Sequence, residues 1–284
     1  MLLRILLLCA VSAPVFAQAN PDWIAPFPPH KIVGNVYYVG SKDLASYLIT
    51  TPQGHILINS NLEASVPSIR ENVERLGFRF ADIKILLISH AHYDHCAGSA
   101  LIKQLTGAKY MVMQGDASVV EDGGRSDFHY GQSRDFLFKP AKVDRVLHDG
   151  DEVRLGDVAL TAHLTAGHTK GCTTWTLQAR EEGTGYRVVI VGSPNVNPGY
   201  KLVDNKGYPG IAQDYEHTFR VLKSLPCDVF LGAHGGYYGM MEKFARAGKA
   251  ASNVFVDPEG YRAYVADREQ VFRAELVRQQ SVRR

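Results

Sequence analysis

The chain has 284 residues, of which 45% are hydrophobic and 21% are charged, as in a globular protein with a sizeable core. Its formal net charge is +2, and no long basic run occurs outside the final VRQQSVRR. A nucleic-acid partner would require a concentrated basic stripe, so nucleic-acid binding is not expected. The arginines of the tail are interpreted as a solvated helix end.

Residues 1–17 have the pattern of a signal peptide. A short basic start at Arg4 precedes an apolar run, and Val15 and Ala17 fit the small-residue cleavage site. The apolar run is too short to span a bilayer, which requires about 20 residues. We therefore predict an exported, periplasmic protein with no membrane partner, whose mature chain is one domain over residues 18–284.

The cysteines do not form a disulfide framework. Cys9 follows a leucine where a lipidation signal requires a small residue, so a lipid anchor is not favoured. The mature chain keeps Cys96, Cys172 and Cys227, an odd number without CxxC spacing, and at most one disulfide can form. Small buried free thiols are the preferred interpretation, because unpaired cysteine behaves as a compact apolar residue.

Strands and helices are expected to follow one another twice along the chain, which predicts two packed sheets with helices outside them. No linker or literal repeat divides the two halves. In the first half we expect strands at 30–40 and 45–60, a helix at 65–78, a buried strand at 83–89, a helix at 99–108, a strand at 109–113 and a long surface loop at 113–139. In the second half we expect three strands within 142–168, strands at 172–181, 186–192 and 227–234, and helices at 213–225 and 259–280.

The stretch SHAHYDHCAG, residues 89–98, contains four potential metal ligands just after a buried strand. On extended backbone His90 and His92 point the same way, whereas Asp94 and His95 are adjacent and cannot share that direction unless the chain turns. Two pairs with different directions suit two metal ions. Imidazole and carboxylate are ligands of Zn²⁺, and a catalytic zinc needs three protein ligands, so each pair lacks one.

Two further histidines stand at strand-to-loop junctions, His168 in TAGHTKGCTTW and His234 in FLGAHGG. The simplest assembly places His90, His92 and His168 on the first zinc and Asp94, His95 and His234 on the second. The remaining histidines have no partner at ligand spacing, although His163 is expected to pack in its strand and His129 could border the pocket. These are His30, His55, His129, His148, His163 and His217.

The motifs HAHYDHCAG, GHTKGCTTW and LGAHGG resemble, in order and spacing, those of the metallo-β-lactamase superfamily, and the chain looks like a subclass B3 member. The resemblance covers essentially the whole mature chain. It implies a four-layer αββα sandwich, in which two mixed sheets carry helices on their outer faces and two zinc ions lie at the sheet edges.

The stretch VGSPNVNPGYKLVDN is similar to the substrate-side loop of that subclass. Ser193 stands where other subclasses place a zinc-binding cysteine. The resemblance implies that Ser193 and Asn197 hydrogen-bond a substrate carboxylate, although ordinary turn formation also explains both residues. Glyoxalase II and the lactonases carry a bridging aspartate after this strand, and here Ser193 and Pro194 supply no carboxylate.

Three positions depart from the family pattern. Asn59 replaces an aspartate of many members, and if it lies behind the ligands it can hydrogen-bond but brings no charge. Cys96 follows a ligand directly and is expected to pack away from the metal. Some B3 members pair a cysteine placed like Cys227 with one near the terminal helix. That region here has Tyr261, so the bridge is expected to be absent.

The resemblance implies zinc-dependent hydrolysis of the β-lactam amide bond of penicillins, cephalosporins and carbapenems, which confers antibiotic resistance on the cell. Metal-bound hydroxide, oriented by Asp94, would be the nucleophile, because zinc lowers the pKa of bound water to about 7. The substrate range would depend on loops around Phe27, Tyr130 and Asn197, and a monomer is expected. The alternatives are another dizinc hydrolase of this fold, such as a lactonase or thioester hydrolase, and a non-catalytic zinc-binding protein.

Overall fold

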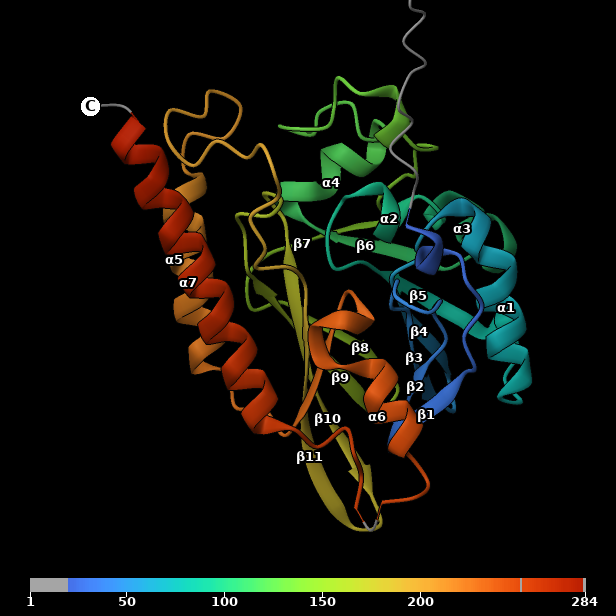
Figure 1. Ribbon diagram of the computed structural model, residues 1–284. Coiled ribbons are helices and arrows are strands. Elements are labelled where there is room, and N and C mark those ends of the chain that lie inside the picture. The colour runs from blue at the N-terminus through green and yellow to red at the C-terminus, as the bar shows by residue number, and fades with distance from the viewer. Residues whose placement is uncertain (1–19, 251, 283–284) are drawn as a thin grey trace, which may run out of the picture.

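The structure, a computed structural model, describes residues 20–250 and 252–282. The predicted signal peptide, residues 1–17, lies outside the described residues. Two sheets face each other, and helices cover both outer faces (Figure 1). This arrangement is the predicted αββα sandwich.

The first sheet has seven strands in the order of the sequence. Neighbouring strands are antiparallel from β1 through β4 and parallel from β4 through β7. A turn at Pro52 and Gln53 closes the β3–β4 hairpin, and Gly54, which begins β4, has φ +127°. The strands are β1 His30–Val33, β2 Val36–Tyr38, β3 Tyr47–Thr51, β4 Gly54–Ile58, β5 Ile83–Leu87, β6 Lys109–Met113 and β7 Arg145–Leu147.

The second sheet has five strands in the order β12-β11-β10-β9-β8. Its central strands are antiparallel, and β12 pairs parallel to β11 at one edge. Both sheets are therefore mixed, as predicted. The strands are β8 Glu152–Leu155, β9 Val158–Leu164, β10 Thr173–Glu181, β11 Thr184–Val191 and β12 Val229–Gly232.

The helices pack against the sheets through the apolar faces from which they were predicted. The helix over the first sheet buries Val66, Ile69 and Val73, and that over the second buries Tyr215 and Phe219. Among the described residues, no helix is both long and apolar enough to cross a bilayer. The helices are α1 Val66–Arg75, α2 Tyr93–Cys96, α3 Ser99–Thr106, α4 Gln114–Glu121, α5 Ile211–Ser224, α6 Met240–Arg246 and α7 Pro258–Val282.

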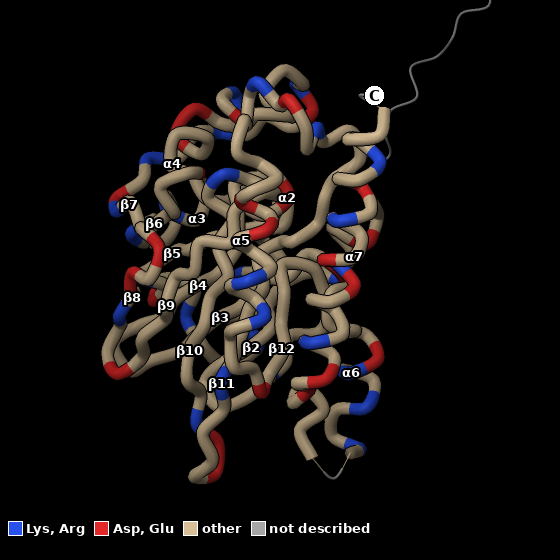
Figure 2. Tube along the Cα trace, turned by 90° about the vertical axis from the view of Figure 1, so that its left-hand side faces the viewer, with Lys and Arg blue, Asp and Glu red and all other residues tan. Residues whose placement is uncertain are grey.

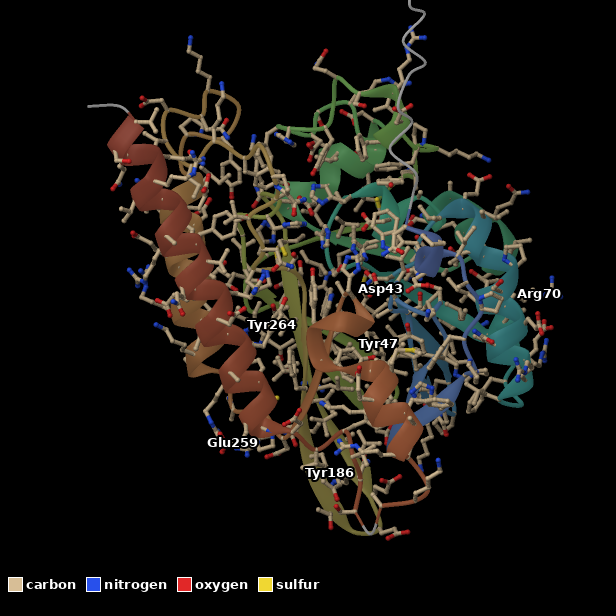
Figure 3. All side chains as sticks on the ribbon, viewed as in Figure 1. Asp43, Tyr47, Arg70, Tyr186, Glu259 and Tyr264 are labelled. Atoms are coloured by element: carbon tan, nitrogen blue, oxygen red, sulfur yellow. The ribbon has the colours of Figure 1, made fainter. Side chains whose placement is uncertain are left out.

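Two buried side chains fasten the sheets to each other by hydrogen bonds as well as by packing. The hydroxyl of Tyr47 on β3 donates to the carbonyl of Gly232 on β12 at 2.7 Å (Figure 3). The indole of Trp175 on β10 donates to the carbonyl of Ile88, just after β5, at 3.0 Å. Both bonds lie next to segments that carry predicted ligands, so the core also sets the distance between those segments.

The prediction of a surface loop over 113–139 is wrong for its first part, where the chain forms α4. The buried face of this helix consists of Asp116, Ala117, Val119 and Val120. The acidic and the small residue on this face weaken the apolar periodicity from which a helix is predicted. The predicted free thiols are confirmed for Cys96, Cys172 and Cys227, which are all buried and unpaired. Basic and acidic residues are interspersed along the visible trace, including along α7 (Figure 2).

Candidate metal centre

A cavity with a volume of about 390 Å³ opens where the segments after β5, β9, β11 and β12 meet. We call it the central cavity. Five of the six predicted ligands reach its surface, and His95, the sixth, is fully buried beneath it. Its principal lining residues are Trp23, Asp43, His90, His92, Tyr93, Asp94, Asp127, Tyr130, Phe136, His168, Asn195, Asn197, His234 and Tyr237.

The chain turns between the two ligand pairs, as the sequence required. β5 ends at Leu87, and α2 begins at Tyr93, so Asp94 and His95 lie on one helical turn. The backbone N–H of His95 donates to the carbonyl of His92 at 2.9 Å, which closes that turn.

Asn59 supports the start of this segment. It has φ +66°, a left-handed conformation that asparagine tolerates better than most residues. Its side-chain Oδ1 accepts a hydrogen bond from the backbone N–H of Ser89 at 2.7 Å, and its Nδ2 donates to the carbonyl of Ala45 at 3.2 Å. The asparagine therefore holds the residue before His90 without adding a charge.

His90, His92 and His168 form the first ligand set. One ring nitrogen from each lies within 4.8 Å of the others, and all three side chains are buried. The ring of His168 is centred 4.6 Å from that of His90 and 4.7 Å from that of His92. The structure therefore brings together residues 78 positions apart in the chain, as predicted from the strand-to-loop positions.

Each ring of the first set has one nitrogen engaged by the protein. Nδ1 of His168 lies 2.8 Å from the carbonyl of Asn195, and Nδ1 of His90 lies 3.2 Å from the preceding serine hydroxyl. Nε2 of His92 lies 3.4 Å from the hydroxyl of Tyr200. These contacts leave one nitrogen of each ring available. The carbonyl of Asn195 only accepts, so it places the proton of His168 on Nδ1 and leaves the lone pair on Nε2.

Asp94, His95 and His234 form the second ligand set. Nε2 of His95 lies 3.1 Å from Nε2 of His234, and Oδ2 of Asp94 lies 3.2 Å and 3.6 Å from these two nitrogens. Nδ1 of His95 is buried and has no hydrogen-bond partner. Two imidazole nitrogens and a carboxylate oxygen that face one another in this way form a donor set for a cation.

Asp43, which the sequence analysis missed, holds His234 from behind. Its Oδ2 accepts a hydrogen bond from Nδ1 of His234 at 2.9 Å, and its backbone carbonyl accepts one from the N–H of Gly235 at 2.7 Å. Figure 3 shows Asp43 beside the end of the first sheet. Such a carboxylate fixes the ring orientation of a ligating histidine. The sequence carried no signal for it, because 191 positions separate the two residues.

Burial sets the charge of the first ligand set. It lowers the pKa of His90 and His168 well below the ordinary value, and it lowers the pKa of His92 to about 4. The three rings are therefore neutral at pH 7, the form in which imidazole binds a metal.

In the second set burial lowers the pKa of His95, whereas the partners of Asp94 and His234 outweigh burial. Burial alone would raise the pKa of Asp94, but the neighbouring His95 holds it well below the usual range. Burial would lower the pKa of His234, but the hydrogen bond that its ring donates to Asp43 raises it. The neutral first set and the acidic second set together fit two divalent cations with nitrogen and oxygen ligands.

The predicted substrate-side residues differ in their access to the central cavity. Asn197 lines it, and its Nδ2 donates to the hydroxyl of Tyr130 at 3.0 Å. Ser193 is 2% exposed, and its hydroxyl lies 3.1 Å from that of Tyr237. Asn195, which the sequence analysis did not select, lines the cavity and donates to the same hydroxyl at 2.7 Å.

Phe27 does not border the central cavity as expected. It is buried in the core, with its ring centred 4.9 Å from that of Phe244. Trp23, which lies four positions earlier, lines the cavity instead and packs its ring 5.9 Å from that of Tyr93. Trp23 takes this place because the short helix at Pro21–Trp23 directs the chain past the cavity before Phe27 enters the core.

The remaining histidines join neither ligand set within the described part of the chain. His163 packs in β9, where its Nε2 lies 2.8 Å from the hydroxyl of Thr176, as expected for a residue of that strand. His129 contacts the rings of Tyr130 and Tyr200 and lies behind the cavity wall.

Comparison with known proteins agrees with this geometry. Residues 45–234 match the family model of the metallo-beta-lactamase superfamily. The native FEZ-1 metallo-beta-lactamase of Legionella gormanii is 56% identical, with a TM-score of 0.89 over 90% of this chain and 98% of that one. The class B3 di-zinc metallo-beta-lactamase LRA-12 from an Alaskan soil metagenome is 39% identical, with a TM-score of 0.86 over 90% of this chain and 97% of that one.

A curated relative, a metal-dependent hydrolase of Anaeromyxobacter dehalogenans, is 29% identical over 71% of this chain but only 65% of its own length. The matched family model covers most of the chain, and the two solved lactamases match nearly all of their own lengths. The chain therefore belongs to the metallo-β-lactamase superfamily and, within it, to subclass B3.

Proposed function

We propose that the protein is a zinc-dependent β-lactamase that hydrolyses the amide bond of penicillins, cephalosporins and carbapenems. The observation that carries the proposal is that the two predicted ligand sets lie side by side at the central cavity, where ligand atoms of Asp94 and His95 lie within 4.8 Å of a ring nitrogen of His90. The solved subclass B3 relatives support the same assignment.

Two zinc ions would be held by the two ligand sets, the first by His90, His92 and His168 and the second by Asp94, His95 and His234. Zinc supplies a Lewis acid and lowers the pKa of a coordinated water to about 7, which makes a nucleophile available at neutral pH. The protein contributes neutral rings in the first set and one ionised carboxylate in the second.

Asp94 is the proposed catalytic residue. Its carboxylate lines the central cavity and is held ionised by His95, so it can accept a hydrogen bond from the attacking water and orient it. Asp43 fixes His234, and the Asn195 carbonyl fixes His168, so the groups around that water are preorganised.

The carboxylate of a β-lactam substrate would lie against the segment after β11. Asn197 and Asn195 present side-chain amides to the cavity there, and Tyr237 presents a hydroxyl. Ser193 would act from behind through Tyr237 and Asn195, with which its hydroxyl is in contact. Trp23, Tyr93 and Phe136 provide apolar surface for the rest of the substrate.

We further propose that residues 1–17 direct export to the periplasm, that the mature domain is monomeric, and that the activity confers resistance to β-lactams. A periplasmic location places the enzyme between an incoming antibiotic and its targets. These proposals rest on the sequence pattern of the first residues and on the proposed activity.

The proposal is tested with purified protein on a chromogenic cephalosporin, a carbapenem, a homoserine lactone and a thioester. Turnover of the lactams is expected, with loss on treatment with a chelator and recovery on addition of zinc. Lactam turnover that survives the chelator contradicts the zinc mechanism. Turnover confined to the lactone or thioester indicates another hydrolase of this fold, and zinc binding without any turnover indicates a sequestering protein.

A further inference from the structure

Asp116 is a buried carboxylate that belongs to neither ligand set. It lies in the first turn of α4 and is 1% exposed. An acidic residue in that turn commonly bonds the free N–H groups of its own helix. No side chain caps the start of α4, however, and both oxygens of Asp116 accept hydrogen bonds from other segments.

The donors come from the two segments that carry the first ligand set. Oδ2 of Asp116 accepts from the backbone N–H of Ala91 and from the hydroxyl of Thr169, both at 2.8 Å. Oδ1 accepts from the backbone N–H of Gly171 at 2.8 Å. Ala91 stands between the first two histidines of the set, and Thr169 directly follows the third. One carboxylate therefore joins both ligand-bearing segments.

The backbones are packed too closely here for a side chain to intervene. A Cβ on Gly171 would lie 2.4 Å from the backbone nitrogen of Asp116, and a Cβ on Gly115 would lie 2.2 Å from the carbonyl oxygen of Lys170. The start of α4 thus rests directly on the 170–171 backbone. This close contact fixes the position of the Asp116 carboxylate between the two segments.

We propose that Asp116 is a positioning residue that sets the spacing between the His90–His92 segment and the His168 segment, and through it the metal affinity of the first ligand set. The proposal deepens the proposed function and rests on it in assuming that a cation binds this set. Asp116 contacts no ligand side chain and is not a catalytic residue.

A carboxylate is needed because three donors converge on two oxygens. Asparagine offers one acceptor oxygen, and its NH₂ group would face at least one of the donors, which would leave that buried donor unpaired. A second bond joins the same segments, from the N–H of Thr173 to the carbonyl of Ser89 at 2.7 Å. Loss of Asp116 should therefore disturb the ligand spacing without separating the two segments.

The test compares Asp116→Asn and Thr169→Val with wild type, both as full mature protein. Zinc affinity is measured by competition with a chromophoric chelator, and the geometry is read from the d–d absorption of the cobalt(II)-loaded protein. We expect zinc binding at the first ligand set to be weakened about tenfold or more in Asp116→Asn and by a smaller factor in Thr169→Val. The cobalt spectrum should change in both.

Asp144→Asn is the control, because Asp144 also accepts a backbone N–H, that of Tyr110 at 2.7 Å, but it pairs with Lys103 and belongs to neither ligand set. It should lose stability while keeping the wild-type zinc affinity and cobalt spectrum. Unchanged affinity and spectrum in Asp116→Asn, or an equal loss in Asp144→Asn, overturn the proposal.

If Asp116→Asn does not fold, Thr169→Val decides alone, since it removes only one donor and keeps the side-chain volume. Wild-type affinity and spectrum in Thr169→Val then overturn the proposal. None of these measurements uses a lactam. A wild-type protein that binds zinc but does not hydrolyse β-lactams would therefore refute the proposed function and leave this test intact.

Discussion

At the residue scale, four of the five imidazoles in the two ligand sets contact a polar group behind them, and His95 does not. His168 is held by the carbonyl of Asn195 and His234 by the carboxylate of Asp43. Both bonds favour the charged ring, but only the carboxylate side outweighs burial, so the pKa of His234 is raised whereas that of His168 is lowered. The two metals should therefore respond differently to changes behind their ligands.

We expect Asp43→Ala to weaken the second zinc about 10- to 100-fold, because the variant frees His234 to rotate and removes the charge behind it. The first zinc should remain bound. Zinc content after dialysis against graded free zinc measures both sites. Asp22→Ala is the control, because Asp22 pairs with Lys42 at 3.0 Å outside both ligand sets. Equal loss of both metals in Asp43→Ala would contradict the assignment.

The metal-free protein should lose stability as the pH falls from about 6.5 towards 4. Burial keeps His90, His92 and His168 neutral in the folded state, and His92 has a pKa of about 4. In the unfolded chain these rings accept protons near pH 6.5. The unfolded state thus binds more protons, so its population rises on acidification.

His234 and Asp116 act in the opposite direction, because their pKa values are raised in the fold, but they are two groups against four rings, since burial also lowers the pKa of His95. Urea unfolding of the chelator-treated protein at pH 7.5, 6.5 and 5.5 measures the trend. A free energy of unfolding that stays level or increases over this series contradicts the buried, neutral state of the first ligand set.

At the element scale, two loops face each other across the central cavity. Tyr130 belongs to the loop after α4 and Asn197 to the segment after β11, and their side chains share a hydrogen bond of 3.0 Å. The ring of Tyr130 also lies 5.2 Å from that of His92. The bond therefore determines how closely the two loops approach above the first ligand set.

Tyr130→Phe removes that bond and keeps the ring. We expect KM for a cephalosporin to rise about fivefold with a smaller change in kcat, because one hydrogen bond contributes about 1 kcal/mol to the loop arrangement. Steady-state kinetics provide the measurement. Tyr186→Phe serves as the control, because Tyr186 lies in the β10–β11 hairpin near the lower end of the molecule, well below Asp43 (Figure 3). A fall in kcat with constant KM would assign Tyr130 to the chemistry instead.

The elements that the sequence predicted are those with a local signal. The HxHxDH spacing required a turn, and α2 supplies it; His168 and His234 stood at strand ends, and the sheets bring both ends to one cavity. α4 was missed because its first turn contains glycine and an acid, and the acid is buried only by contacts with distant segments. Asp43 likewise gains its role only when β12 reaches the first sheet.

Two segments that the sequence placed near the substrate show the same limit. Phe27 lies in the core while Trp23 lines the cavity, and Ser193 is buried in contact with Asn195, which lines the cavity. In both cases the sequence identified the correct segment. The neighbouring strands set the backbone direction of a short loop, and this direction decides which of its residues faces the cavity. The hydrophobic periodicity of the sequence does not contain that information.

At the scale of the whole molecule, stability depends on contacts between the two sheets. The Tyr47 hydroxyl donates to the carbonyl of Gly232 and also accepts from its N–H at 3.3 Å. Both partners are fully buried in the core between the sheets.

Tyr47→Phe should lower the free energy of unfolding by about 1–3 kcal/mol, because it leaves a buried carbonyl without this donor. Chemical denaturation with saturating zinc measures the loss. Zinc content of the folded fraction should stay at the wild-type level, since Tyr47 touches no ligand. A stability within about 0.5 kcal/mol of wild type, the range of ordinary surface substitutions, would contradict a bracing role for this tyrosine.

The ligands come from both sheets, four from the segment after β5 and one each from the segments after β9 and β12. Neither half of the polypeptide therefore contains all six predicted ligands. If the chain were cut between β7 and β8 and the halves were produced as separate polypeptides, neither fragment alone would retain two ions. Reassembly of the fragments would then be visible as cation uptake, so this fold could serve as a complementation reporter read by metal content.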